Sequence, residues 1–231
     1  MAKSSTAVAV AEPAALALPT NALPDYMSKN TGRGNENVEA GHLQIPRIKL
    51  LQKMSDEVDR HHANYVEGAK DGDFFNNLTG QNYGDALYAI SVSFKDEFVV
   101  WRKREAGGGF GGTFATEAEA RAFCAAQEKP ADYDISQTHS HVLLIKDPAT
   151  GTLSKPVIMD FSSSKLRVSR NWNSQIDIKG GDRFSCLWKL SSVAAKNKTG
   201  AQFMNLEVEN MGWTTQEDYS TAENYYKQFA K

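Results

Sequence analysis

The fold of this chain is decided by one stretch, Pro156-Val-Ile-Met-Asp-Phe-Ser-Ser-Ser-Lys-Leu-Arg-Val-Ser-Arg-Asn-Trp-Asn-Ser-Gln-Ile176. Its first part, Val157 to Phe161, is apolar and rich in β-formers, which predicts a buried strand. The serines that follow are residues that end strands and cap helices. Val168, Trp172 and Ile176 then recur at every fourth position, so they share one side of a helix. We therefore expect a strand followed by a short basic helix that packs through one apolar stripe.

The composition indicates a water-soluble protein with a single core. The chain has 231 residues, of which 41% are hydrophobic, and this is enough for one substantial domain. No window reaches the roughly eighteen uncharged apolar residues that span a bilayer, so we expect no membrane partner. Glu12 and Pro13 interrupt the alanine-rich opening, which argues against a signal peptide. Cys124 and Cys186 are too few for a disulfide framework or a four-cysteine zinc site, so a reducing cytoplasm is expected.

Positive charge gathers in one segment of a mildly acidic chain. The formal net charge is −2, yet Val157 to Gly200 contains eight Lys and Arg against three Asp, a local charge of +5. Such a segment is typical of anion binding at a defined place. Random variation of surface charge produces the same distribution, so both interpretations stay open at this point.

Periodicity predicts antiparallel strands on both sides of the opening stretch. A turn at Lys95 to Glu97 is expected to fold two of them into a hairpin, and His139 to Lys146 is expected to pair with the strand after Pro156. Helices are predicted after the capping box that begins at Thr116 and after a cap at Thr214 or Thr215. The expected strands are Ile45 to Leu51, Ala86 to Phe94, Phe98 to Arg104, His139 to Lys146, Val157 to Phe161, Arg183 to Val193 and Gln202 to Val208.

The residues show no convincing catalytic constellation, so we expect no enzyme, no cofactor and no metal. Gly107 to Gly112 lacks both the ending of a P-loop and the residue order of a dinucleotide site. We interpret it as a flexible hairpin extension or flap, and a disordered loop of no function stays open as the alternative. His139 and His141 share one face of a strand, a spacing that metal sites use. No third ligand is identifiable, and two histidines on a solvated face are the favoured interpretation. A metal-dependent enzyme stays as a minor option.

Cations beside tryptophans favour nucleic-acid binding. Lys and Arg neutralise phosphates, and stacking a base on an aromatic ring contributes about 1–3 kcal/mol. Each tryptophan is also a good core residue, and Trp172 is better explained as part of a helix that plugs a barrel. Direct contact is therefore expected first at Trp101 to Arg104, Phe110 and Lys189. The full set of candidate residues is Trp101, Arg102, Lys103, Arg104, Phe110, Lys165, Arg167, Arg170, Trp172, Trp188, Lys189, Lys196 and Lys198.

The order of the expected elements resembles the OB-fold, in which a helix is inserted between short antiparallel strands. This resemblance implies a mainly β, α+β protein with an OB-like Greek-key barrel of five to six antiparallel strands, an inserted helix at Lys165 to Ile176 and a C-terminal helix. Residues 1–40 would form a flexible arm, residues 41–213 the nucleic-acid-binding domain, and residues 214–231 a helix packed on that domain.

Several local runs carry a second resemblance: Leu23-Pro-Asp-Tyr26, Gly32-Arg-Gly-Asn-Glu36, Ile45-Pro-Arg-Ile-Lys-Leu-Leu-Gln52, Gly72-Asp-Phe-Phe-Asn-Asn-Leu-Thr-Gly80, Asn197-Lys-Thr-Gly200, Glu207 to Gly212 and the tyrosine-rich last helix. They resemble a family of small bacteriophage-encoded proteins that are similar to phage single-stranded DNA-binding proteins. The resemblance implies sequence-independent binding of single-stranded DNA in replication or recombination, in the host cell cytoplasm, with phage replication or recombination proteins as partners. A homo-oligomer is compatible with it. The chain departs from many such proteins because it ends Tyr-Tyr-Lys-Gln-Phe-Ala-Lys231 and has no acidic tail.

A second function stays open beside this one. The arm contains a small apolar island, Leu23-Pro-Asp-Tyr-Met27, in otherwise polar surroundings. Such an island is suited to docking on another protein. The alternative is therefore a virion or host-interaction protein that binds a protein partner through its N-terminal arm.

Overall fold

The computed structural model describes residues 34–38 and 42–229, and the chain divides into two compact units, residues 1–43 and 44–231. In the first unit, residues 34–38 contain a turn in which the Gly34 N–H donates to the Glu36 carboxylate over 3.0 Å. Backbone N–H groups lower the pKa of this carboxyl. Most of the predicted arm, including residues 23–27, lies outside the described residues.

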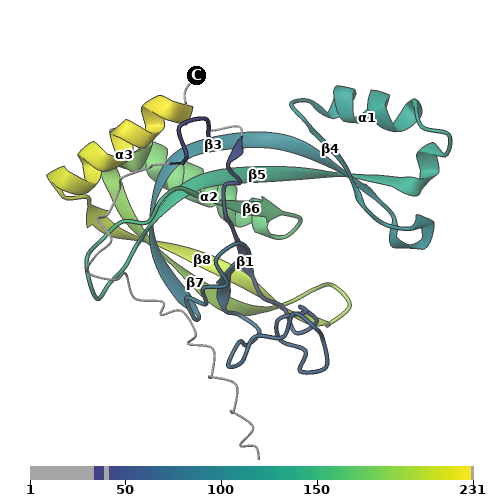
Figure 1. Ribbon diagram of the computed structural model, residues 1–231, viewed down its shortest axis with the longest axis horizontal. Coiled ribbons are helices and arrows are strands. Elements are labelled where there is room, and N and C mark those ends of the chain that lie inside the picture. Colours follow the sequence, from purple (N-terminus) through teal and green to yellow (C-terminus); the bar gives the residue numbers. More distant parts are fainter. Residues whose placement is uncertain (1–33, 39–41, 230–231) are drawn as a thin grey trace, which may run out of the picture. The chain divides into compact units, whose positions relative to one another are not determined.

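The second unit is built on one mixed sheet that curls into a half-barrel (Figure 1). The eight strands follow the order β2-β1-β6-β5-β3-β7-β8, with β4 paired to β3 outside this path. All pairs are antiparallel except β1 with β6. A mainly β, α+β fold is thus confirmed, whereas an OB-type Greek key is not. The strands are β1 (Arg47–Leu50), β2 (Phe74–Asn76), β3 (Ala86–Arg102), β4 (Phe110–Phe114), β5 (Tyr133–Lys146), β6 (Val157–Ser162), β7 (Cys186–Lys196) and β8 (Gln202–Trp213).

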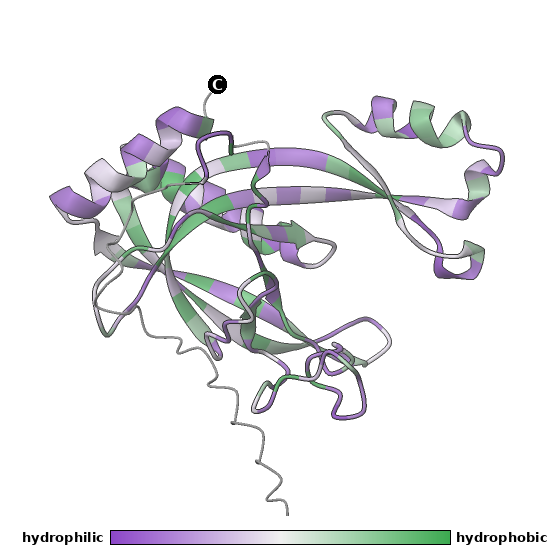
Figure 2. Cartoon of the chain, in the orientation of Figure 1, coloured by the Kyte–Doolittle hydropathy of each residue, from purple (hydrophilic) through white to green (hydrophobic). Residues whose placement is uncertain are grey.

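β3 is one strand of 17 residues where the sequence predicts two strands and a turn. Residues 95–97, the predicted turn, pair in register with residues 138–140 of β5. Figure 2 shows this hydrophilic segment partway along the strand. Asp96 accepts a hydrogen bond of 3.0 Å from the Gln137 side chain across the ladder. The predicted hairpin is therefore wrong, because charged residues are accommodated inside a strand where polar partners lie opposite them.

The strand and helix predicted from the opening stretch are both present. β6 begins at Val157, and the helix α2 (Lys165–Lys179) follows after a short turn. Trp172 of α2 is fully buried, and Val168 and Ile176 pack against the same core cluster. The predicted apolar stripe is thus confirmed as the contact between α2 and the main core. The serine before the helix, Ser164, makes no capping bond with its side chain.

The helix α3 (Gln216–Phe229) covers a second cluster of buried residues. Val142 and Leu144 of β5 belong to this cluster, whereas their neighbour Leu143 belongs to the main core. Since alternate residues of a strand point to opposite faces, α2 and α3 lie on opposite faces of the sheet. Lys146 and Asp218 form an ion pair that joins β5 to α3. None of the helices among the described residues is both long and apolar enough to cross a membrane.

The far ends of β3 and β5 carry a smaller structure that we call the distal lobe: residues 98–102 of β3, β4, the helix α1 (Glu117–Ala125), and residues 126–135. Val100 is buried here against α1 in a hydrophobic cluster of its own. The predicted capping box is present, because Thr116 and Glu119 each accept from the backbone N–H of the other over 3.2 Å. The described residues also include the short 3-10 helices η2 (Arg104–Ala106), η3 (Pro130–Asp132) and η4 (Arg183–Ser185).

Candidate nucleic-acid interface

Two exposed aromatic side chains lie side by side on the distal lobe. Trp101 is 49% exposed and Phe110 is 63% exposed. The two residues are partners in the ladder between β3 and β4, and their ring centroids lie 5.6 Å apart at an interplanar angle of 66°. The second half of the glycine-rich run, Phe110 to Gly112, lies in β4, and this strand holds Phe110 beside Trp101. An exposed pair of this kind can stack on a flat ring of a ligand.

A cavity of about 920 Å³ lies next to this pair, at the end of β3. Asp134 lines the cavity and is also the ladder partner of Trp101, so the cavity adjoins the aromatic pair. Lys103 reaches Asp134 over 3.7 Å. Four cations therefore face three carboxylates, and the local excess of positive charge is small. The charged lining residues are Arg102, Lys103, Arg104, Glu105, Lys129, Asp132 and Asp134.

Lys129 is a cation of this cavity that the sequence did not indicate. It belongs to the connection that follows α1, which sequence reasoning treats as purely structural. The Lys103 N–H donates to the Asp132 carbonyl over 2.7 Å and thereby holds this connection against the end of β3. This bond and the ladder pair of Arg102 with Tyr133 join residues that are distant in sequence, and they bring Lys129 to the cations of β3.

A groove of about 400 Å³ extends from the aromatic pair across β5 to β6. Glu97 and Trp101 of β3 lie on the same face of the sheet, and Ser140 of β5 lies close to Glu97. The Ser140 Oγ is 2.7 Å from Asp160 Oδ1 and 3.1 Å from Glu97 Oε2. Arg47 forms an ion pair with Asp160. The sequence does not predict that the polar side chains of this groove lie together. Glu97, Val99 and Trp101 share one face because they alternate along one strand, whereas the sequence predicts a turn at Glu97.

The candidate cations of α2 do not join this groove as a group. Arg170 donates to the Gln137 side chain over 3.2 Å. Gln137 points to the face of the β3–β5 ladder that is opposite to Asp134 and its ladder partner Trp101. Burial lowers the pKa of Lys165, and nearby Asp160 opposes this shift. Arg167 is exposed on α2. Lys165 is thus associated with the Asp160 end of the groove, whereas Arg170 lies behind the sheet.

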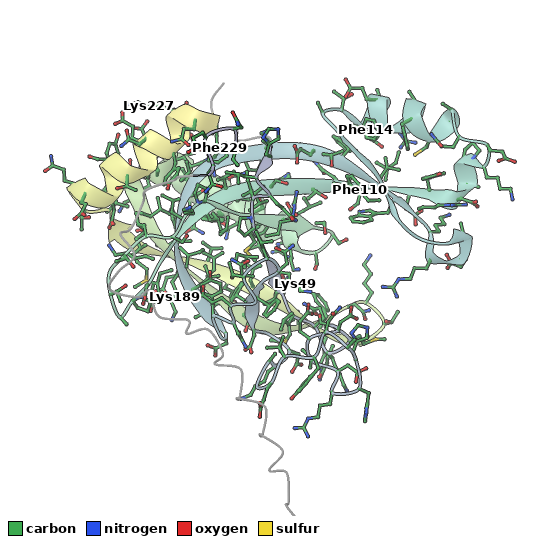
Figure 3. The ribbon with its side chains drawn as sticks, in the orientation of Figure 1. Lys49, Phe110, Phe114, Lys189, Lys227 and Phe229 are labelled. Atoms are coloured by element: carbon green, nitrogen blue, oxygen red, sulfur yellow. The ribbon has the colours of Figure 1, made fainter. Side chains whose placement is uncertain are left out.

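The candidate lysines of β7 lie at the other end of β3. Lys189 is the ladder partner of Tyr88, about 40 Å along β3 from Trp101 at ~3.3 Å per residue. Figure 3 shows Lys189 and Phe110 at opposite ends of the sheet. Lys196 lies still further away, beyond the start of β3, and Lys198 follows it in the turn to β8. The structure therefore separates these three lysines from the distal lobe.

Trp172 and Trp188 are core residues, which corrects the expectation that they stack on bases. Both side chains are fully buried under α2, and their ring centroids lie 5.9 Å apart. Neither indole N–H has a hydrogen-bond partner among the described residues. A base could reach these rings only if the main core opened. Their hydrophobic bulk, which α2 needs for packing, outweighs their capacity for stacking.

His139 and His141 are also buried, which corrects the expectation of a solvated pair. Both share the hydroxyl of Ser169, at 2.8 Å from His139 Nδ1 and 2.7 Å from His141 Nε2. His139 Nε2 lies 3.7 Å from Asp96 Oδ1. Among the described residues no cluster of three or more His, Cys, Asp or Glu could hold a metal ion. The two histidines thus meet a serine where a metal site would need a third ligand.

The hydrogen bonds assign the protons of this buried cluster. A neutral imidazole carries one proton and a serine hydroxyl donates once. With the proton of His139 on Nε2 toward Asp96, Ser169 donates to His139 and accepts from His141. His141 Nδ1, which has no hydrogen-bond partner in the described part of the chain, is then a bare acceptor. The reverse assignment would bury an unpaired N–H and turn a lone pair of His139 toward the Asp96 carboxylate, so it is disfavoured.

Comparison with known proteins places the chain in a family. The family model of the Pam3 phage gp34-like proteins matches residues 16–231. The chain belongs to this family. It is thereby a member of a bacteriophage protein family, which confirms the phage origin implied by the sequence runs. No curated protein and no solved structure matches the chain.

Proposed function

We propose that this protein binds single-stranded DNA through its distal lobe and has no enzymatic role. The observation that carries the proposal is the exposed pair Trp101 and Phe110 beside a cavity that contains four cations. Stacking suits any base, since every base has a flat π-face. Phosphate neutralisation is equally independent of sequence. The combination supports binding without recognition of a sequence motif.

The chain belongs to a phage protein family and carries this exposed aromatic pair. Together these observations support a role in replication or recombination, where single strands must be protected or presented. The site of action would be the host cell cytoplasm, and phage replication or recombination proteins would be the partners. The curled sheet supports a further likeness to OB-type barrels, which also bind single strands on a strand face. A homo-oligomer is compatible with this role.

The charge of the site predicts modest, salt-sensitive affinity. Glu105, Asp132 and Asp134 offset most of the positive charge in the cavity. If about three phosphates are neutralised, the logarithm of the affinity falls with the logarithm of the salt concentration at a slope of about −2. We therefore place the protein among weak or cooperative binders at physiological salt.

Fluorescence anisotropy with a labelled oligo-dT of about fifteen nucleotides tests the proposal, since site sizes of this order are usual for single-strand binders. The variant Trp101→Ala should weaken binding about tenfold, because one base loses its stacking partner. Trp213→Ala is the matched control, since Trp213 is also exposed but lies at the end of β8. Absence of oligo-dT binding by the full chain at low salt would overturn the proposal.

The alternative of a protein-binding virion or host-interaction protein rests on residues 23–27. These residues lie outside the described part of the chain, so no structural observation favours the alternative. Nuclease treatment separates the two ideas in extracts of infected cells. Partners that are lost with nuclease support the proposed function, whereas partners that survive support the alternative.

A further inference from the structure

We infer that the groove beside Trp101 holds bases that carry an amino group, so that oligo-dC binds more tightly than oligo-dT. This inference rests on the proposed function and adds a preference for base type to it. The groove is distinct from the cationic cavity, because its polar end contains the carboxylates Glu97 and Asp160. Its chemistry therefore differs from what phosphate binding requires.

The path of a bound strand follows from the strand register. Glu97, Val99 and Trp101 alternate along β3 and face the same way, and Ser136 lies opposite Val99 on β5. From Trp101 to Glu97 the backbone advances about 13 Å at ~3.3 Å per residue. A base stacked on Trp101 thus has its neighbour over Ser136 and Val99, with the polar end of the groove within reach.

The polar end of the groove contains two carboxylates, and they differ in how many hydrogen-bond donors they already engage. Asp160 is already engaged, because it pairs with Arg47 and accepts from Ser140 over 2.7 Å. The Ser140 hydroxyl has one proton, and its distance of 3.1 Å to Glu97 is the longer of the two. Among the ion pairs of the described residues none includes Glu97. A half-buried carboxylate is therefore left with oxygen atoms that are free to accept.

An uncompensated carboxylate discriminates among the chemical groups of DNA. It accepts from the N4 amino group of cytosine or the N6 amino group of adenine. At the position of the cytosine N4 amino group thymine presents its O4 carbonyl oxygen, which Glu97 repels. A phosphate is repelled more strongly, so the backbone is directed to the cations at the end of β3. Cytosine and thymine have rings of the same size, which makes them the sharpest comparison because stacking is nearly the same for both.

The test measures oligo-dC and oligo-dT binding by the full chain with anisotropy, in a buffer alkaline enough to keep cytosine unprotonated. The wild type should bind oligo-dC about five- to tenfold more tightly. Glu97→Gln should bring this ratio close to one and leave oligo-dT affinity equal or higher, because the amide also donates to thymine oxygen. Glu207→Gln removes the same charge from an exposed position of β8 and should keep the wild-type ratio.

The outcomes separate this inference from the proposed function. Equal affinity of the wild type for both oligonucleotides, with Trp101→Ala weakening both, would overturn the base preference and leave single-strand binding intact. An unchanged preference in a folded Glu97→Gln variant would overturn the assignment to Glu97. Failure of the wild type to bind either oligonucleotide would overturn the proposed function itself. Circular dichroism of each variant establishes that the fold is retained.

Discussion

Trp101 and Arg170 lie on opposite faces of the ribbon formed by β3 and β5. Trp101 is the ladder partner of Asp134, whereas Arg170 donates to Gln137, three positions further along the same strand. An odd number of positions along a strand changes the face. The basic segment of the sequence therefore does not become one basic surface, and its cations differ in their access to the exposed aromatic pair.

This separation predicts different effects for two arginines that look equivalent in the sequence. Arg104→Ala should weaken oligo-dT binding and reduce the salt slope by about 0.7, the contribution of one phosphate on a single strand. Arg170→Ala should leave both quantities unchanged, although it removes the same charge from another exposed position. Titrations at three salt concentrations measure the slope. Equal losses in the two variants would place α2 in the interface and contradict the geometry.

The parts of the fold that the sequence predicted are those with a local signal. The stripe of Val168, Trp172 and Ile176 gave the helix α2, and the spacing of Thr116 and Glu119 gave the start of α1. Both signals depend on residues within one or two helical turns. The opposite holds for β3, where three charged residues have the composition of a turn but are paired with polar residues of β5 that are about 40 positions away. No local pattern contains that pairing.

The candidate site shows the same limit. Trp101, Phe110 and the cations at the end of β3 were identified because an aromatic residue and three cations are adjacent in the chain. Lys129 and Glu97 were not identified, because their role depends on which strands and loops meet. Trp172 and Trp188 are among the predicted nucleic-acid-binding residues because the type of a side chain indicates its capacity for stacking but not its burial. Helical periodicity had already indicated the burial of Trp172, and that signal was the better guide.

The distal lobe has its own hydrophobic cluster, so it should respond to mutation separately from the main core. Thr116→Ala removes the hydroxyl that caps α1 and should cost about 1 kcal/mol of local stability. Hydrogen exchange should accelerate in residues 117–125 and stay unchanged in residues 143–145, which lie in buried β5. Thr113→Ala, an exposed threonine of β4, is the control. Uniform acceleration in both regions would show that the lobe and core unfold together.

Ser169 is the single hydroxyl that satisfies two buried histidines. Ser169→Ala should leave His139 Nδ1 and His141 Nε2 without their shared partner, at about 1–3 kcal/mol for each unpaired group. Ser174→Ala, at an exposed position of the same helix, should change stability by less than about 0.5 kcal/mol. Urea denaturation at neutral pH measures both. Similar midpoints for the two variants would show that the two histidines find other hydrogen-bond partners when the Ser169 hydroxyl is removed.

The buried histidines also predict how stability depends on pH. Burial lowers the pKa of His139, with Asp96 opposing and Arg170 adding to the shift, and burial lowers the pKa of His141 further, aided by Arg183 and His139. The unfolded chain binds protons at these residues near the ordinary histidine value of about 6.5. Because the folded state takes up these protons only at lower pH, stability is complete above about pH 6.5 and falls as the pH decreases below it.

The expected loss is at most about 1.4 kcal/mol per pH unit for each histidine, measured by urea denaturation between about pH 7.5 and 5.5. His141→Phe keeps an aromatic ring against Trp172, which stacks on His141 with centroids 4.6 Å apart, and removes the group with the larger shift. It should reduce the pH dependence by at least half, whereas His61→Phe in an exposed loop should not change it. Equal pH dependence in the two variants would mean that the folded protein admits the proton at His141, and that the buried cluster rearranges to bind it.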